Sequence, residues 1–385
     1  MEAILEKFIV LCEDPYGRLN DWKIENRKEV IGCLPMYVPE ELIAAAGMLP
    51  VILLGSMKSV TKANKHLLTM TCEELRSTYD MLLNGRFEFI DGVVMPLICD
   101  QIRFAGDLWD MDHPFPFFHQ IWLSARMDDL GKEFLMNEFH RFKEHLEEYS
   151  GREISSHAIE KSIHTYNQNR ALLRRLYELK GANPALMTAD DFMKVVISSM
   201  TMPKETHTEL LVELVSAAEE LKAPDTVDKT PLLLLGHPCA APEKELIDLI
   251  EELGGVIIDD DLYTGYRYFS TDAELNGNPM ESLADRFMKG VPCPIKHHPG
   301  QFKNEPGSPM GYPGFIIDFF KKSKARGILF LQTMFCDPYD WEFPSLKERL
   351  EEERIPFQKI ATGLESHSIE PLRTRLAAFL EVLEK

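Results

Sequence analysis

Short apolar runs that alternate with helix-patterned segments dominate the first and last thirds of this chain. The helical segments PEELIAAAG and CEELRSTYDMLLNG both end in glycine, as helices often do. This alternation is typical of mostly parallel sheets with helices on their faces. We therefore predict an α/β protein with two doubly wound, mostly parallel-sheet lobes. The apolar runs span residues 29–35, 49–55, 89–97, 117–123, 232–236, 256–260, 328–332 and 356–361.

The middle of the chain has a different pattern. From residue 127 to 228 the strand-like runs disappear, and charged segments with a period near 3.6 residues predict helices. The stretch APDTVDKTP at 223–231 contains two prolines and is typical of a linker. Because 385 residues exceed what one hydrophobic core usually supports, we expect several units. These are an N-terminal α/β lobe (1–126), a helical segment (127–228) and a C-terminal α/β lobe (229–385). The helical segment thus lies between the two lobes in the sequence.

The excess of acidic residues limits the classes of partner that the protein can bind. The 62 acidic residues outnumber the 42 basic residues, which gives a formal charge of -20. Such a surface repels nucleic-acid phosphates and anionic lipid, so we expect neither as a partner. No apolar run approaches the roughly 20 residues of a membrane span. The N-terminal segment MEAILEKFIVLCEDP has the pattern of an amphipathic helix and no signal-peptide cleavage site, so we expect a cytoplasmic protein.

The seven cysteines are odd in number and widely scattered, which excludes a disulfide framework. Two of them repeat one local pattern at a separation of 237 residues: Cys99 in GVVMPLICDQIR and Cys336 in GILFLQTMFCDPYD. Each follows a strand-like run and precedes an aspartate, which is a good helix N-cap. We therefore expect both cysteines near helix N-termini at the carboxyl ends of strands, where α/β proteins gather ligands. The backbone N–H groups there favour the thiolate, the form that binds metals.

Cys72 is a third candidate for the same position. The sequence TCEE fits a capping box with Thr71 as N-cap and Glu74 three residues later, which would make Cys72 the first helical residue. Three thiolates at three helix starts, from both lobes, could meet in the cleft between the lobes. Sulfur ligands select zinc, cuprous copper or iron–sulfur clusters. Three thiolates leave a fourth coordination position open, a feature of reactive sites.

Other roles for the cysteines stay open. Free cysteine is often buried as core filler, which is what we expect of Cys12 and Cys33. Cys239, in GHPCAAP directly after a strand-like run, is a rival metal ligand. Cys293, in the proline-rich stretch VPCPIKHHPG, could line the same cleft.

Five segments together resemble one family, and they occur in order from about residue 25 to the C-terminus. They are VIGCLPMYVPEELIAAAGMLPVILLG, MTCEELRSTYDMLL, GVVMPLICDQIR, LQTMFCDPYDWEFPSLKERLEEERIPFQKIATG and EPLRTRLAAFLEVL. The chain resembles the 2-hydroxyacyl-CoA dehydratase and ATP-dependent benzoyl-CoA reductase family, and within it the shorter, C-type subunit of the reductase. The resemblance implies a [4Fe-4S] cluster held by Cys72, Cys99 and Cys336.

The resemblance also implies a reaction and partners. It implies low-potential single-electron reduction of an aromatic acyl-CoA such as benzoyl-CoA to a cyclic diene-carbonyl-CoA, in anaerobic aromatic degradation. The alternative is a subunit of an (R)-2-hydroxyacyl-CoA dehydratase that uses a ketyl radical. Both imply a related second cluster-bearing subunit and a separate ATP-hydrolysing iron–sulfur activator. The sequence has no GxxxxGK[ST] loop, which agrees with ATP being used on another chain.

Ring reduction also needs proton donors, and histidine suits proton transfer near neutral pH. His237, His297 and His298 occur in loops that could face the cleft. Tyr263 and Arg267, in DDDLYTGYR, follow a strand-like run and could contact the substrate or its CoA moiety. Two other classes of protein stay open on the sequence alone: a non-catalytic electron-relay subunit and a protein with a structural zinc site.

Overall fold

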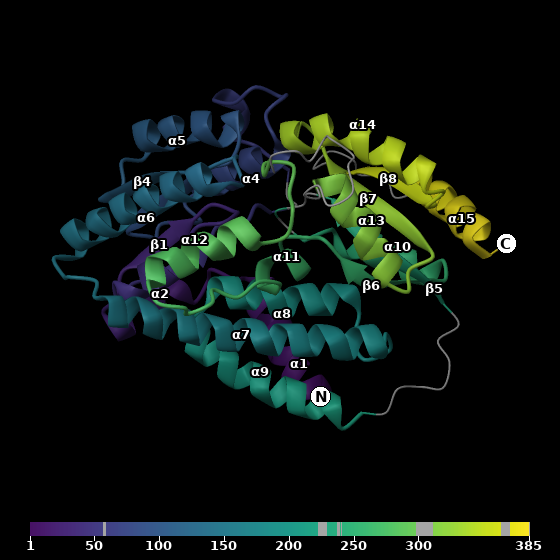
Figure 1. Cartoon of the computed structure of the whole chain (residues 1–385), viewed down its shortest axis with the longest axis horizontal. Helices are drawn as coiled ribbons and strands as arrows, with labels where there is room; N and C mark the ends of the chain where they lie inside the picture. The colour runs from purple at the N-terminus through teal and green to yellow at the C-terminus, as the bar shows by residue number, and fades with distance from the viewer. Residues whose placement is uncertain are drawn as a thin grey trace.

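The computed structural model describes residues 1–56, 59–221, 229–236, 239, 241–297, 311–362 and 370–384. Two separate four-stranded sheets are present, and every strand pairing in them is parallel. In Figure 1 the two sheets lie in neighbouring lobes, with the helices of residues 156–219 running below them and the helix of residues 129–150 beside the N-terminal sheet. The predicted α/β class with two parallel-sheet lobes is confirmed.

The N-terminal lobe has the strand order β2-β1-β3-β4. Its strands coincide with the first four predicted apolar runs. Every residue of the first three strands is buried, as expected for strands that are covered on both faces. The edge strand β4 alternates between buried and more exposed residues, as expected for a strand covered on one face. The elements are β1 (Val30–Cys33), α3 (Glu40–Ala45), β2 (Leu49–Ile52), a short 3-10 helix (Ala63–Lys65), α4 (Glu73–Leu83), β3 (Gly92–Leu97), α5 (Asp100–Asp112) and β4 (Phe117–Trp122).

The C-terminal lobe repeats this arrangement with the order β6-β5-β7-β8. Its strands coincide with the last four predicted runs, and the predicted linker ends where β5 begins, at Thr230. The elements are β5 (Thr230–Gly236), α10 (Lys244–Glu252), β6 (Gly255–Asp260), α11 (Tyr266–Phe269), α12 (Pro279–Lys289), α13 (Tyr312–Lys322), β7 (Gly327–Thr333), α14 (Asp337–Glu352), β8 (Phe357–Thr362) and α15 (Glu370–Glu384).

Helices make up the middle segment, as its periodicity predicts. Polar side chains cap three of them: Asp128, Ser155 and Thr188 each accept a hydrogen bond from a backbone N–H of the first turn. The helices are α6 (Asp129–Ser150), α7 (Ser156–Ala182), α8 (Ala189–Thr201) and α9 (Lys204–Glu219). The N-terminal helices are α1 (Glu2–Glu13) and α2 (Leu19–Asn26), and α1 packs against α8 and α9.

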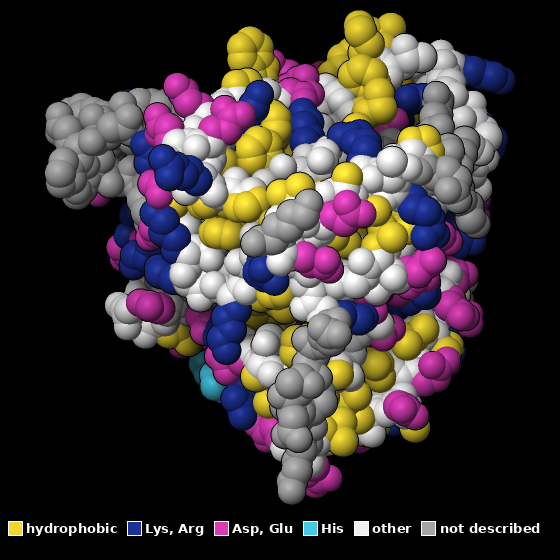
Figure 2. All heavy atoms as spheres, turned by 90° about the vertical axis from the view of Figure 1, so that its right-hand side faces the viewer, with side chains coloured by type: hydrophobic (Ala, Val, Ile, Leu, Met, Phe, Trp, Pro, Cys, Tyr) yellow, Lys and Arg dark blue, Asp and Glu magenta, His cyan; other side chains and the backbone are white. Residues whose placement is uncertain are grey.

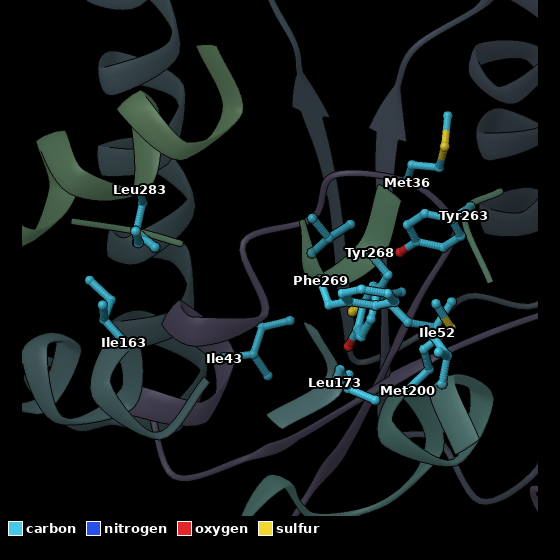
Figure 3. Close-up of a cluster of buried hydrophobic side chains, with 14 of the residues drawn as sticks. Met36, Ile43, Ile52, Ile163, Leu173, Met200, Tyr263, Tyr268, Phe269 and Leu283 are labelled. Carbon is cyan, nitrogen blue, oxygen red and sulfur yellow. The ribbon is translucent and has the colours of Figure 1, made fainter. Parts of the chain in front are cut away.

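One large hydrophobic core joins the N-terminal lobe, the helical segment and the stretch after β6. Figure 3 shows its buried side chains, which come from the N-terminal lobe (Ile43, Ile52), the helical segment (Leu173) and the stretch after β6 (Tyr263, Phe269). α12 also packs against α6 and α7 of the helical segment. This core runs across both boundaries of the three-unit division predicted from sequence. The division itself stays a prediction.

The surface carries acidic and basic side chains side by side. Figure 2 shows this for the face that bears the C-terminal lobe, and hydrophobic side chains project along its upper edge. In Figure 1, α5 and α14 lie along that edge. Large exposed side chains of these helices include Phe104, Met111 and Trp341. In the described part of the chain, no helix has the length and apolar composition that a membrane span requires.

Gly236→Ala should destabilise the protein by roughly 2–4 kcal/mol, as measured by urea unfolding. Gly236 ends β5 with a φ of +133°, and a Cβ there would lie 2.0 Å from the carbonyl oxygen of Leu331 on β7. Gly151→Ala is the matched control, because Gly151 also has a positive φ but its Cβ would meet no atom within 4 Å. We expect that control to cost about 1 kcal/mol. Equal losses in both variants would contradict the steric explanation.

Candidate metal centre

A pocket lies at the carboxyl ends of the central strands of both sheets. In each sheet the strand order reverses between its two central strands, and such switch points form a crevice that binds ligands. Segments that follow β1, β3 and β7 line the pocket, so the crevices of the two lobes face the same space. Its volume is about 630 Å³, including space open to solvent.

Five cysteines line this pocket. They include Cys72, Cys99 and Cys336, the three predicted metal ligands, so two thiols of the N-terminal lobe meet one thiol of the C-terminal lobe. The rivals Cys239 and Cys293 line the same pocket and are buried. Of the two cysteines expected in the core, Cys33 is fully buried in β1, whereas Cys12 is half-buried on α1. The Cys12 thiol donates a hydrogen bond to the carbonyl oxygen of Lys194, at 3.1 Å.

Each of the three predicted ligands is the N-cap residue of a helix. Cys72 precedes α4, Cys99 precedes α5 and Cys336 precedes α14. The predicted capping box is therefore wrong by one residue, because Cys72 itself occupies the N-cap position assigned to Thr71. Glu74 makes a different contact: its carboxylate accepts a hydrogen bond from the backbone N–H of Gly55, at 2.6 Å.

Burial decides the protonation of these thiols. It raises the pKa of Cys72 to about 12 and also raises the pKa values of Cys99 and Cys336. The negative charge on a neighbouring cysteine adds to this rise at Cys72 and Cys336, while N–H groups of the first helical turn oppose it at all three. The helix starts alone therefore do not produce thiolates here, contrary to the expectation from sequence. A bound cation would supply the missing positive charge and deprotonate the thiols.

The donor set, thiols in a mainly apolar pocket, is chemically suited to an iron–sulfur cluster. Within the described ranges, no three His, Cys, Asp or Glu side chains lie close enough together to hold one metal ion. A cluster carries its thiolates on different iron atoms, so its ligands stand further apart than those of one ion. The pocket walls are mainly apolar, with Leu34, Met36, Ile98, Ile102 and Ile295 among them. Such walls exclude water from a redox centre.

Gln101, which the sequence analysis missed, links the three cysteine turns. Its side-chain oxygen accepts a hydrogen bond from the backbone N–H of Cys72. Its side-chain nitrogen donates to the carbonyl oxygen of Phe335 at 2.9 Å and to Asp337 at 3.0 Å. No local sequence signal could have identified it, because these contacts form only when the two lobes meet.

A second pocket adjoins the first and is lined by Tyr263 and Arg267, the predicted substrate contacts. Residues 34–36 line the first pocket and residues 37–41 line the second. Both predicted side chains are buried, and the guanidinium of Arg267 pairs with the carboxylate of Asp261 and donates to the carbonyl oxygen of Pro292 at 3.0 Å. Their contact with substrate stays a prediction.

Of the three predicted proton donors, His297 is the one within the described residues, and it lines neither of these two pockets. His237 and His298 lie outside the described residues. His297 is exposed, and its backbone forms a bridge with the segment after β4, in which its N–H donates to the carbonyl oxygen of Ala125 at 2.7 Å. The role of these histidines in proton transfer stays a prediction.

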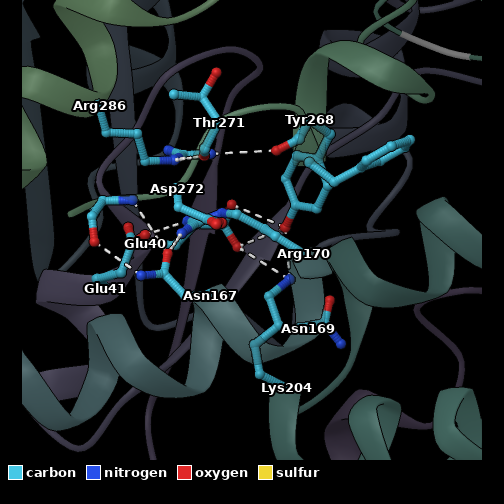
Figure 4. A network of polar contacts seen from close by, with 12 residues as sticks. Glu40, Glu41, Asn167, Asn169, Arg170, Lys204, Tyr268, Thr271, Asp272 and Arg286 are labelled. Atoms are coloured by element: carbon cyan, nitrogen blue, oxygen red, sulfur yellow. Dashed lines mark hydrogen bonds and ion pairs between the residues drawn. The ribbon is translucent and has the colours of Figure 1, made fainter. Parts of the chain in front are cut away.

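Buried titratable groups that the sequence did not indicate surround the second pocket instead (Figure 4). Lys204 donates a hydrogen bond to the hydroxyl of Tyr268 at 2.6 Å, and this hydroxyl donates to the carboxylate of Glu40 at 3.0 Å. Burial lowers the pKa of Lys204 to about 8 and raises the pKa of Glu40. Such a chain of hydrogen-bonded groups can hold and pass a proton.

The adjacent pair of Arg170 and Glu41 is almost fully buried, with side-chain exposures of 5% and 1%. Burial acts to raise the pKa of Glu41, but the guanidinium groups of Arg170 and Arg286 and the hydrogen bonds of the carboxylate together outweigh it and hold the pKa below its ordinary value. The pair joins α7 to α3 and so fixes the helical segment against the N-terminal lobe.

Comparison with known proteins adds to this geometry. The sequence profile described as "2-hydroxyglutaryl-CoA dehydratase, D-component" matches residues 35–383. The chain belongs to this family. This family member is 30% identical to the beta subunit of (R)-2-hydroxyglutaryl-CoA dehydratase from Acidaminococcus fermentans, over 100% of both chains. It is 29% identical to the (R)-phenyllactyl-CoA dehydratase beta subunit from Clostridium sporogenes, over 99% of each chain, and 28% identical to the C-type subunit of benzoyl-CoA reductase from Thauera aromatica, over 98% of each chain.

These relatives confirm the family predicted from sequence. The names of these relatives describe them as enzyme subunits. The present chain is similar to them over nearly its whole length. Their names divide between dehydratases and a reductase at nearly equal identity, which leaves the reaction of the present chain undetermined.

Arg170→Met should destabilise this family member by about 3–5 kcal/mol, because it removes the guanidinium that pairs directly with the buried Glu41 carboxylate. Urea unfolding of the single variant and of the double variant Arg170→Met with Glu41→Met measures the effect. The double variant removes both charges and should recover most of the loss. A double variant as unstable as the single one would show that packing, rather than the uncompensated charge, causes the loss.

Proposed function

We propose that this chain is one of two related cluster-bearing subunits of an enzyme that acts on an acyl-CoA thioester with low-potential single electrons. The observation that carries the proposal is the meeting of three N-cap cysteines, from two lobes, in one apolar pocket at facing switch points. Cys72, Cys99 and Cys336 are the residues that would hold a [4Fe-4S] cluster. When bound, the cluster would supply single-electron transfer.

The surrounding residues have separate tasks in this proposal. N–H groups of the first turns of α4, α5 and α14 would stabilise the thiolates, since each lowers the pKa of its cysteine. The apolar walls would keep water, and thus wasteful proton reduction, away from the electrons. Tyr263 and Arg267 would contact the acyl-CoA from the adjoining pocket. Besides His237, His297 and His298, the chain of Lys204, Tyr268 and Glu40 is a candidate for supplying protons there.

Reduction of an aromatic acyl-CoA such as benzoyl-CoA is the first candidate reaction. It adds electrons and protons in equal number to the ring, and gives a cyclic diene-carbonyl-CoA. Its support is the similarity to the C-type subunit of benzoyl-CoA reductase over 98% of the chain, together with a pocket whose walls are mainly apolar.

Dehydration of an (R)-2-hydroxyacyl-CoA is the second candidate. Its support is the similarity to beta subunits of (R)-phenyllactyl-CoA and (R)-2-hydroxyglutaryl-CoA dehydratases, at 29% and 30% identity. Here the electron would be returned after water leaves the substrate, so it would act catalytically. If the substrate binds on the partner chain in either reaction, this subunit would relay the electron.

The proposal includes a related second subunit and a separate ATP-hydrolysing activator. Exposed hydrophobic side chains support a partner contact beside the cysteine turns: Met334 lies in the turn that bears Cys336, and Phe104 and Trp341 lie at the start of the second turns of α5 and α14. The Trp341 side chain is 85% exposed, which is unusual for so large an apolar group.

Replacing any one proposed ligand should remove iron. We expect Cys72→Ala, Cys99→Ala and Cys336→Ala to lose most of the iron and sulfide that the wild-type chain retains after purification without oxygen. The physical reason is that each thiolate would hold a different iron atom of one cluster. Iron and acid-labile sulfide determinations per chain measure the effect.

Cys12→Ala is the control, because Cys12 lies on α1 and does not line the pocket. It should keep wild-type iron. Equal iron in the Cys12 and Cys99 variants would refute the ligand assignment. Zinc in place of iron and sulfide in the wild-type chain would support a structural zinc site instead.

The electron requirement should separate the two reactions. A tag on this chain would isolate the complex from its source without oxygen, and the activator, ATP and a low-potential reductant would then be added. For the reductase we expect benzoyl-CoA to be consumed with electrons in stoichiometric amounts. Loss of water from a 2-hydroxyacyl-CoA with only catalytic amounts of electrons would instead establish the dehydratase.

A further inference from the structure

We propose that Gln101 is the positioning residue of the metal centre, whose side-chain amide sets the spacing between the cysteine turns of the two lobes. The inference rests on the proposed function, because it concerns the cluster that Cys72, Cys99 and Cys336 would hold. It adds a residue that binds neither iron nor substrate but acts through the ligands.

The contacts of Gln101 reach all three cysteine turns. Gln101 lies in the first turn of α5, two residues after Cys99. Its side-chain oxygen accepts from the backbone N–H of Cys72, at the start of α4. Its side-chain nitrogen donates to the carbonyl oxygen of Phe335 and to the carboxylate of Asp337, the residues on either side of Cys336. One half-buried side chain thus joins two turns of the N-terminal lobe to the turn of the C-terminal lobe.

Only a side chain that both donates and accepts can make this set of contacts. The N–H of Cys72 requires an acceptor, while the Phe335 carbonyl and the Asp337 carboxylate require a donor. A primary amide offers one oxygen acceptor and two N–H donors in a fixed plane, and these partners fix its orientation. A carboxylate of the same size would meet the N–H of Cys72 but repel both oxygens across the lobe boundary.

The backbone on the C-terminal side of this contact is strained. Phe335 has a φ of +62°, which is uncommon for a large side chain, and it directly precedes Cys336. Such conformations persist where neighbouring contacts hold them, and they concentrate at functional sites. The hydrogen bond from Gln101 to the Phe335 carbonyl is one such contact. We infer that Gln101 holds the turn in the conformation that directs Cys336 into the shared pocket.

The consequence is an effect on the cluster itself. Groups that orient metal ligands affect both the retention of the metal and, through hydrogen bonds around the sulfurs, its reduction potential. The loss of Gln101 should therefore change the rate of iron release and the electronic properties of the cluster, while leaving the iron-free fold intact.

The test uses the full chain purified without oxygen, with its cluster. Iron release to a ferrous chelator should be about 10- to 100-fold faster in Gln101→Ala than in the wild type. The electron paramagnetic resonance spectrum of the reduced cluster should also shift in that variant. Gln101→Glu should release iron nearly as fast, because it keeps the acceptor for Cys72 but loses both donors.

A rescue variant tests the contact across the lobes. Gln101→Glu combined with Asp337→Asn reverses the donor and acceptor across the lobe boundary, since the new amide can donate to the new carboxylate. This double variant should release iron several-fold more slowly than Gln101→Glu. Gln168→Ala is the matched control, because Gln168 is an exposed glutamine on α7, and it should behave as the wild type.

The outcomes separate this inference from the proposed function. Wild-type protein without iron and sulfide would overturn both. Iron in the wild type, with release rates and spectra in the Gln101 variants within twofold of the control, would overturn only the role of Gln101. Faster release without a spectral shift and without rescue would also overturn it, because a general loss of packing would explain that result. The iron-free variants should melt within a few degrees of the iron-free wild type.

Discussion

Parallel strand pairing in one order, repeated in both lobes, is the constraint on which the rest of the structure depends. In each sheet the first and third strands in chain order are central, and the connections that follow them leave to opposite sides. β3 and β7 are these third strands, and the turns after them bear Cys99 and Cys336. A Cys-Asp pair that recurs after 237 residues is therefore the same position in two similar sheets. The two positions share a pocket because the lobes face each other there.

Local patterns could predict much of this arrangement. All strand positions followed from apolar runs, and the three cysteines were chosen because each adjoins a helix start, a property of a few neighbouring residues. Features that depend on contacts between distant segments could not be predicted in this way. Gln101 has its role only because the start of α14 meets the start of α5, and Glu40 meets Lys204 and Tyr268 from far along the chain. The capping position of Cys72 was wrong by one residue because the capping-box pattern favours Thr71, whereas Glu74 of that pattern contacts the distant Gly55 instead.

Burial of the cysteines and the N–H groups at the helix starts have opposite effects on the thiolates, which explains why the cysteine turns need a bound cation. The N–H groups that point towards each sulfur stabilise the thiolate. The free energy needed to bury its charge away from water is larger than this stabilisation, so the pKa of each cysteine rises. The three turns are therefore complementary to a cation and unfavourable for free thiolates. The same balance distinguishes this pocket from the neighbouring one, where Arg267 and Asp261 already neutralise each other.

The packing of the N-terminal helix has a consequence for synthesis of the chain. The apolar side chains of α1, Leu5 and Phe8 among them, are covered by α8 and α9, which end about 200 residues later at Glu219. At ribosomal rates this interval lasts roughly 10–40 s. During that time the two helices that pack against α1 are incomplete, although the strands of the first lobe are already complete. Helix α1 is thus synthesised long before the helices that cover it, and its docking waits for them.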